Sequence, residues 1–167
     1  MQKIGFGGSC HWCTEAIFRS LKGIVAVEQG WIGSDGKNSV PSEAVIVTYD
    51  ENEISLQVLI AIHLHTHNCT AERSMRNKYR SAVYAFYNKQ AIEAQTAMNE
   101  LQSDFDQPII TKVLPFQVFR LNDENYLDYY YKDPSKPFCQ NIVNPKLKEL
   151  VKRFQTYILP EREAQLA

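Results

Sequence analysis

The sequence has no marked excess of either charge and few cysteines. Its 167 residues include 18 Lys or Arg and 19 Asp or Glu, which gives a net charge of -1, and the basic residues are dispersed. Such a balance offers no electrostatic basis for binding nucleic acid or an anionic membrane. Four cysteines in a chain of this length are too sparse for the disulfide framework of a small secreted protein.

Long apolar runs, internal repeats and low-complexity tracts are also missing. No stretch approaches the length needed to span a bilayer, and the first residues lack the basic and apolar regions of a secretory signal. We therefore expect a cytoplasmic protein that acts as a monomer and binds neither membrane nor nucleic acid. With 44% apolar residues and no linker, we expect residues 1–167 to form a single domain.

Hydrophobic periodicity and turn residues divide the chain into alternating strands and helices. The pattern predicts strands over 2–7, 24–32, 43–49, 80–87 and 109–114, and helices over 11–22, 55–65, 88–103, 123–130 and 144–154. The chain thus begins with strand, helix, strand, strand, helix and strand. This order predicts an α+β fold with a ferredoxin-like two-layer α/β sandwich core, followed by a long C-terminal segment.

Two of the predicted helices have more specific expectations. In the helix over 88–103 we expect a buried face, made of Ile92, Ala97, Met98 and Leu101. For the last helix we expect Asn144 as the cap and Pro145 in the first turn.

The run Gly7-Gly8-Ser9-Cys10-His11-Trp12-Cys13 places a cysteine between an apolar strand and a helix. The partial positive charge of a helix N-terminus favours the thiolate, which is the nucleophilic form of cysteine. We therefore interpret Cys10 as a reactive thiol with Trp12 as an aromatic wall. A helical i, i+3 spacing brings two Cα atoms to about 5 Å, within the span of a disulfide. Cys13 could thus pair with Cys10 or be an inert packing residue.

A second polar cluster, His63 to Cys69, contains three histidines and a cysteine. On a helix, His63 and His67 would share a face at i, i+4, as zinc ligands can. A helix that ends near residue 65 would disrupt that spacing. We therefore favour solvated or packed histidines and expect no metal site.

The first motif resembles that of the A-type peptide methionine sulfoxide reductases (MsrA), which is Gly-Cys-Phe-Trp-(Gly or Cys)-x-Glu. The matching residues are Cys10, Trp12, Cys13 and Glu15, whereas His11 stands in place of the Phe. Other matches extend the resemblance over about residues 3 to 154. They are Glu43 in a His-Ala-Glu-Val-like segment, Tyr79-Arg80-Ser81 for Gln-Tyr-Arg-Ser, Trp31 for a pocket Tyr and Cys139 for Pro-Tyr-Cys. The chain is thus similar to a divergent member of that family.

The resemblance implies reduction of methionine-S-sulfoxide, peptide-bound or free, with no cofactor and no metal. Cys10 would attack the sulfoxide sulfur and become a sulfenic acid, while Glu43 would protonate the oxygen. In the family, the oxygen is held by residues that match Tyr79 and Trp31, and the methyl group enters a pocket that matches His11 and Trp12.

A second thiol then forms an intramolecular disulfide with Cys10, and a thioredoxin-type protein reduces that disulfide. We favour Cys13 as this resolving thiol, because Cys139 lies on an irregular, proline-rich segment that would have to be carried in.

Two other functions remain open at this point. The C-x-x-C spacing of Cys10 and Cys13 also fits a thiol–disulfide oxidoreductase, although the Cys-Gly-Pro-Cys type of loop is missing. Alternatively, the chain could be an inactive paralogue that binds methionine sulfoxide peptides without turnover. The changes at His11 and Trp31 keep this second alternative open.

Overall fold

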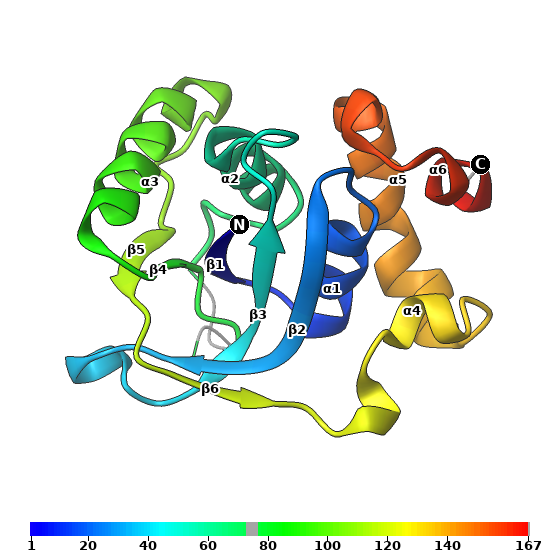
Figure 1. Cartoon of the computed structure of the whole chain (residues 1–167), viewed down its shortest axis with the longest axis horizontal. Helices are drawn as coiled ribbons and strands as arrows, with labels where there is room; N and C mark the ends of the chain where they lie inside the picture. Colours follow the sequence, from blue (N-terminus) through cyan, green and yellow to red (C-terminus); the bar gives the residue numbers. More distant parts are fainter. Residues whose placement is uncertain (73–76, 167) are drawn as a thin grey trace.

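The computed structural model describes residues 1–72 and 77–166. This part of the chain contains a six-stranded sheet with the order β5-β4-β1-β3-β2-β6 (Figure 1). The strands are β1 (Gln2–Gly7), β2 (Ile24–Gly33), β3 (Ser42–Tyr49), β4 (Ala82–Ala85), β5 (Lys112–Pro115) and β6 (Val118–Leu121). Neighbouring strands are antiparallel, except for β4 and β5, which are parallel.

The four central strands confirm the ferredoxin-like core. Their order is β4-β1-β3-β2, with α1 (His11–Arg19) between β1 and β2 and α2 (Leu56–His65) between β3 and β4. After α3 (Asn88–Leu101), β5 extends the sheet beside β4, and β6 extends it beside β2. The strand β6 was not predicted, because its four residues do not alternate between apolar and polar side chains.

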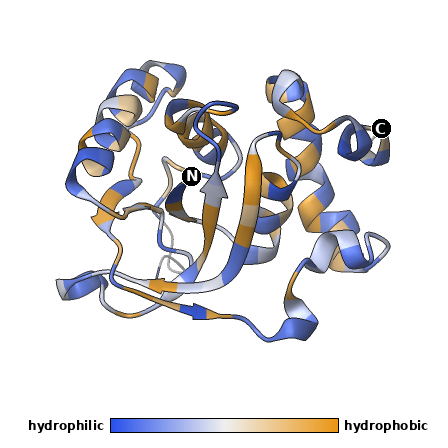
Figure 2. Ribbon diagram, viewed as in Figure 1, coloured by the Kyte–Doolittle hydropathy of each residue, from blue (hydrophilic) through white to orange (hydrophobic). Residues whose placement is uncertain are grey.

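The helices α1, α2 and α3 share one buried cluster with alternate residues of the strands. On β1 these are Ile4 and Phe6, and on β3 they are Val45 and Val47. A smaller cluster, centred on Ile32, Ile46 and Tyr84, lies on the opposite face. Figure 2 shows apolar colour over parts of β2 and β3, and both colours on α3 and α5, as amphipathic helices have.

In α3, the prediction that Ile92 is buried is wrong. Ile92 is 67% exposed, and the buried residues are Gln90, Ala94, Ala97 and Met98. Their spacing of four, three and one defines a stripe on which Ile92 does not lie. The polar Gln90 belongs to the stripe because its side chain donates to the Lys3 carbonyl at 2.7 Å and accepts from the Phe86 amide at 2.8 Å.

The segment after β6 differs most from the predictions. The helix expected over 123–130 is replaced by a 3-10 turn (Glu124–Tyr126) and the short α4 (Tyr129–Lys132), because Asp128 has a left-handed φ of 53°. The last helix begins before Asn144: a π-helical turn (Cys139–Val143) leads directly into α5 (Asn144–Phe154). Asn144 is therefore not a cap, although Pro145 does lie in the first turn of α5.

The C-terminal elements pack against α1 on the side away from α3 (Figure 1). After α5 come a 3-10 turn (Gln155–Tyr157) and α6 (Pro160–Leu166), and an isolated bridge joins Leu21 to Ile158. Two further 3-10 turns lie at Gly36–Asn38 and Gln102–Asp104. Among the described helices, none is both long enough and apolar enough to cross a membrane.

Candidate active site

Cys10 occupies the N-cap position of α1, directly after the turn that leaves β1. The turn requires glycine at position 8, because its φ is 150° and a Cβ there would lie 2.5 Å from the His67 ring. The Cys10 carbonyl accepts from the amides of Cys13 at 3.0 Å and Thr14 at 3.2 Å, so the helix starts at this residue. The Cys10 side chain is partly exposed, whereas Cys13 is buried.

The thiols of Cys10 and Cys13 are hydrogen-bonded to each other. This bond, together with burial, raises the pKa of Cys10, and the same bond lowers the pKa of Cys13. The two thiols therefore titrate as a coupled pair, in which Cys13 loses its proton before Cys10. The expectation that the helix N-terminus makes Cys10 the thiolate is wrong for the resting pair: the Trp12 amide does lower the pKa of Cys10, but the bond to Cys13 and burial outweigh it.

Glu43 lies near the start of β3, on the sheet face that α1 covers. It alternates with Val45 and Val47, which lie in the core, and it is 6% exposed. One carboxylate oxygen, Oε1, accepts from the His11 backbone amide at 3.2 Å and lies 3.4 Å from His11 Nε2. The other oxygen, Oε2, lies 3.6 Å from Lys78 Nζ. The carboxyl group is thus held at the start of α1, next to the residue that follows Cys10.

The His11 ring is buried and both of its nitrogens have polar neighbours. Nδ1 donates to the Gly30 carbonyl at 2.8 Å, and Nε2 lies 3.4 Å from Asn122 Nδ2. The amide of Asn122 donates to Gln29 Oε1 at 2.6 Å, and Gln29 donates to Glu15 Oε1 at 3.0 Å. A buried polar chain therefore runs from Glu43 through His11 to Glu15.

The two tryptophans frame His11. Trp31 is paired with Glu43 across β2 and β3, so both side chains lie on the same face, and its ring is 5.1 Å from that of His11. Trp12 lies 6.1 Å from the His11 ring and stacks on Tyr129 at 4.0 Å. The Trp12 indole nitrogen is buried and has no hydrogen-bond partner in the described part of the chain.

The segment 78–80 is fixed to the start of β3. The Lys78 carbonyl accepts from the Glu43 amide at 3.0 Å and from the Ser42 hydroxyl at 2.8 Å, and the Arg80 amide donates to Ser42 Oγ at 2.8 Å. The Lys78 ammonium is hydrogen-bonded to Tyr79 and faces Glu43, and both contacts raise the pKa of Lys78. The structure thus brings the predicted pair Glu43 and Tyr79 to the same place, with Lys78 between them.

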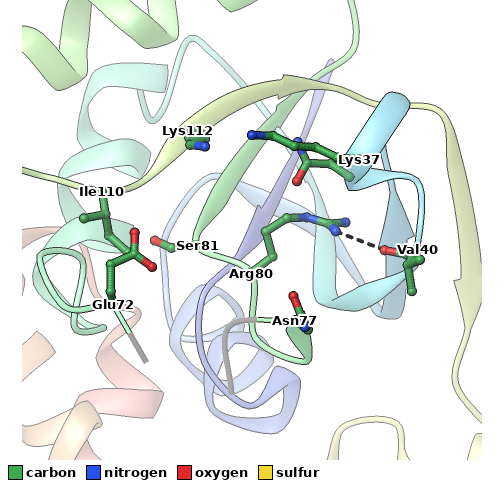
Figure 3. Close-up of a pocket in the computed structure, with 9 residues that line it drawn as sticks. Lys37, Val40, Glu72, Asn77, Arg80, Ser81, Ile110 and Lys112 are labelled. Atoms are coloured by element: carbon green, nitrogen blue, oxygen red, sulfur yellow. Dashed lines mark hydrogen bonds between the residues drawn. The ribbon is translucent and has the colours of Figure 1, made fainter. Parts of the chain in front are cut away.

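A pocket of about 490 Å³ lies elsewhere, and no predicted site residue lines it (Figure 3). Its lining includes Lys37, Lys112 and Arg80. The Arg80 side chain donates to the carbonyls of Val40 and Ile32 and to the Tyr84 hydroxyl, each at 3.0 Å. Arg80 therefore ties the 78–80 segment to β2, the following loop and β4, which fixes the position of Tyr79.

Two sequence interpretations need correction or completion. Cys139 is not on an irregular, mobile segment: it is fully buried in the π-helical turn, and burial raises the pKa of its thiol. His63 Nε2 donates to the Gly7 carbonyl oxygen at 2.8 Å. His67 Nε2 lies 2.8 Å from Ser81 Oγ. Within residues 1–72 and 77–166, no group of three His, Cys, Asp or Glu residues is arranged to bind a metal.

Sequence reasoning missed three members of this site: Gln29, Asn122 and Lys78. The sequence does indicate that Gln29 faces inward, because it alternates with Val27 and Trp31 along β2. In the structure Gln29 is fully buried. Asn122 follows β6, which has no clear hydrophobic pattern, and no feature of the sequence indicates its role. Lys78 stands where the related motif Gln-Tyr-Arg-Ser has Gln, and its ion pair with Glu43 depends on the tertiary structure.

The fold and this site define a thiol enzyme built on a ferredoxin-like core, and comparisons with known proteins agree. The family model for peptide methionine sulfoxide reductase matches residues 2–158. The peptide methionine sulfoxide reductase MsrA of Psychrobacter sp. (strain PRwf-1) is 34% identical over 95% of this chain and 99% of the relative. This chain belongs to the peptide methionine sulfoxide reductase family.

Solved structures share the fold. Reduced Mxr1 from Saccharomyces cerevisiae has a TM-score of 0.74 at 22% identity, over 83% of this chain and 88% of Mxr1. Mxr1 in complex with Trx2 has a TM-score of 0.61 at 22% identity, over 77% of this chain and 84% of that chain.

Proposed function

We propose that this protein reduces methionine-S-sulfoxide, in peptides and as the free amino acid, with Cys10 as nucleophile and Glu43 as acid. Family membership supports the reaction class. The observation that carries the residue assignment is the bond from the His11 amide to Glu43 Oε1 at 3.2 Å. It holds a carboxyl group beside the residue that follows the partly exposed thiol, where a sulfoxide could contact both.

The first step transfers the oxygen to Cys10. Cys10 reacts as the thiolate, after its thiol proton is lost to solvent. The sulfur–oxygen bond of the substrate breaks, and the oxygen ends bonded to Cys10 Sγ. Glu43 supplies the proton that this oxygen takes up. The Cys10 sulfur loses two electrons and becomes a sulfenic acid, while the substrate sulfur gains two electrons and leaves as methionine. Tyr79 and Trp31 hold the oxygen, while His11 and Trp12 contact the methyl group.

The second step regenerates the thiol. Cys13 attacks the Cys10 sulfenic acid, a disulfide forms, and water leaves with the Cys13 proton. A thioredoxin-type dithiol then reduces the disulfide by exchange. The Mxr1–Trx2 complex shows a protein of this fold bound to Trx2, which supports a reductant of that kind. Cys139 remains the alternative resolving thiol, since it shares a buried cluster with Cys13.

An assay with the two pure epimers of a methionine sulfoxide substrate and dithiothreitol tests this function. We expect reduction of the S epimer alone, and no reduction by Cys10→Ser, because a hydroxyl at neutral pH does not replace a thiolate. A thiol–disulfide oxidoreductase would act on a disulfide substrate and leave both epimers unchanged. An inactive paralogue would bind the S epimer without turnover. Either result, or turnover by Cys10→Ser, would reject the proposal.

We further propose that the protein works as a monomer in the cytoplasm. The balanced charge and the absence of a long apolar run support this setting. Light scattering of the purified protein and fractionation of its native cells test the two statements separately.

A further inference from the structure

Arg120 is the outermost residue of a row of side chains that crosses three strands. Glu43 on β3 is opposite Trp31 on β2, and Trp31 is opposite Arg120 on β6. Directly opposite residues of antiparallel strands point to the same face, so all three side chains lie on the face that carries the proposed site. Glu43 is buried, Trp31 is partly buried and Arg120 is exposed. The row therefore leads from the proposed acid to the surface at β6, an edge strand of the sheet (Figure 1).

The Arg120 guanidinium is held by an aromatic ring rather than by an acid. Its Cζ lies 4.2 Å from the centre of the Trp31 ring, which is a cation–π distance. Among residues 1–72 and 77–166, no carboxylate lies within 4.0 Å of the Arg120 side chain, and no group accepts a hydrogen bond from it. Its N–H donors, which form a planar fork that fits a carboxylate, therefore remain available for a ligand.

The other charged groups near the site already have partners. Lys78 Nζ faces Glu43 Oε2 at 3.6 Å, and Lys136, which lies over the Tyr129 ring, interacts with Asp133. The backbone of Glu43 is two strand spacings from that of the edge strand, which is about 10 Å. Glu43 therefore does not neutralise the charge at the outer end of the row.

We propose that Arg120 is a specificity-determining residue that binds a carboxylate carried by the substrate beside the methionine sulfoxide. The inference rests on the proposed function and deepens it, because it gives the charge of the preferred substrate. The Trp31 ring lies 5.1 Å from the His11 ring and contacts the Arg120 guanidinium. A substrate whose oxygen is held at Trp31 therefore has the guanidinium within reach of its neighbouring groups.

Two sources can supply this carboxylate. One is the α-carboxylate of free or C-terminal methionine sulfoxide, which four covalent bonds separate from the sulfur, a span of roughly 5 Å. The other is the side chain of an acidic residue next to the methionine sulfoxide in a peptide. Both sources present the same planar, bidentate acceptor to the Arg120 fork.

The kinetic test uses two pairs of S-sulfoxide substrates that differ only in charge. The first pair is N-acetylmethionine sulfoxide and its amide, and the second is a peptide with Glu or Gln next to the oxidised methionine. We expect the parent to have a higher kcat/KM for the charged member of at least one pair. In Arg120→Met this ratio should fall about tenfold, mainly through KM, which is the scale of one hydrogen bond between charged groups. Arg120→Lys should recover part of the ratio, because it keeps the charge but not the fork.

Arg162→Met is the matched control. The Arg162 guanidinium also lies over an aromatic ring, with Cζ 3.7 Å from the centre of the Tyr131 ring. The Tyr131 hydroxyl is hydrogen-bonded to Ser20, at the opposite end of α1 from Cys10. This variant makes the same change in charge and breaks the same type of contact away from the site, so both substrate ratios should keep their parent values.

The outcome for the two pairs identifies the source of the carboxylate. A fall in the first ratio assigns the α-carboxylate, and a fall in the second assigns a neighbouring acidic residue. Unchanged ratios in Arg120→Met, or an equal loss for charged and neutral substrates, would overturn the proposal, because Arg120 would then be inert or would only support Trp31. A similar fall in Arg162→Met would also overturn it, since net charge alone would explain the preference. Far-UV circular dichroism confirms that each variant is folded.

A binding test does not depend on turnover. Isothermal titration calorimetry of Cys10→Ser measures the Kd of each substrate in the two pairs. We expect tighter binding of the charged member, and a loss of about tenfold in that preference when Arg120→Met is added. Equal Kd values within both pairs would reject the inference even if the parent reduces methionine sulfoxide. The expected Kd values with no reduction of either epimer by the parent would instead reject the proposed function.

Discussion

The Glu43 carboxyl group is buried, and contacts from two sides make that burial tolerable. The His11 amide satisfies one oxygen, and the Lys78 ammonium faces the other. The two thiols also depend on each other, since their contact raises the pKa of Cys10 and lowers the pKa of Cys13. The proposed acid Glu43 and the proposed nucleophile Cys10 therefore each depend on their direct neighbours, and single substitutions should separate their roles.

Glu43→Gln should lower the single-turnover rate by about 10² or more, the usual scale of general acid catalysis. The amide keeps the shape of the side chain but cannot give a proton to the developing oxyanion. Alkylation of Cys10 at a rate close to that of the parent is the control that the nucleophile is intact. A change in turnover within twofold would show that another group is the acid.

Cys13→Ser should block multiple turnovers with thioredoxin while sparing one turnover and much of the activity with dithiothreitol. The reason is that Cys13 is hydrogen-bonded to Cys10, whereas Cys139 is fully buried in a helical turn. Cys139→Ser is the matched variant and should show this split weakly or not at all. Peptide mapping of the oxidised protein checks the order directly. A first-formed Cys10–Cys139 disulfide would reverse the assignment, and a Cys13–Cys139 bridge would mean that both act in relay.

Among the secondary-structure elements, β2 and β6 position the second half of the site. The two strands approach so closely at Gly30 that a Cβ would lie 1.9 Å from the Arg120 carbonyl oxygen. This contact places Asn122, which follows β6, against His11 and Gln29. The same glycine also provides the carbonyl that orients the His11 ring.

Gly30→Ala should therefore separate β6 from β2 and reduce the free energy of unfolding by about 2 kcal/mol or more, as overpacking does. Chemical denaturation measures this loss, and the NMR signal of the His11 ring should move as well. Gly36→Asn is the control: nothing lies within 4 Å of a Cβ there, and Asn tolerates the left-handed φ of 54°. Equal free energies of unfolding for the two variants would show that the packing of β6 against β2 does not require glycine at position 30.

The core elements could be predicted from sequence because their signals are local. Alternating or buried apolar runs mark β1 to β3, and Gly8 marks the turn before Cys10. The boundaries were less reliable: α1 ends at Arg19 rather than near 22, β4 covers only Ala82–Ala85, and β5 lies at Lys112–Pro115 rather than 109–114. The π-helical turn at Cys139 and the bend at Asp128 depend on packing against α1, which no local pattern encodes.

In the whole molecule, the site is where distant segments of the chain meet. Residues before 50 supply Cys10, Cys13 and Glu43, and the 78–80 segment supplies Tyr79 and Lys78. Asn122 completes the polar chain. The resemblance of short motifs could indicate the residues before 50 and those of the 78–80 segment. It could not indicate Asn122 or the ion pair with Lys78, because these contacts arise only when the sheet is complete.

The folded molecule should lose stability steeply between pH 10 and about 12. Burial raises the pKa of Tyr49 to about 12, and burial also raises the pKa of Tyr84, Tyr130 and Tyr131. The unfolded chain releases these protons near pH 10 while the folded chain keeps them, so rising pH favours unfolding over this interval. Urea unfolding at a series of pH values measures the loss. Tyr49→Phe should make it shallower, and an unchanged slope would contradict this assignment.

The sequence contains two tryptophans, Trp12 and Trp31, and both contact His11. Trp12 is stacked on Tyr129, and Trp31 lies under the Arg120 guanidinium. Light emitted after selective tryptophan excitation therefore comes from the two indole rings that flank His11, the residue that follows Cys10. The intrinsic fluorescence of this protein is thus a label-free optical reporter of its site, which can follow substrate arrival and thiol oxidation in real time.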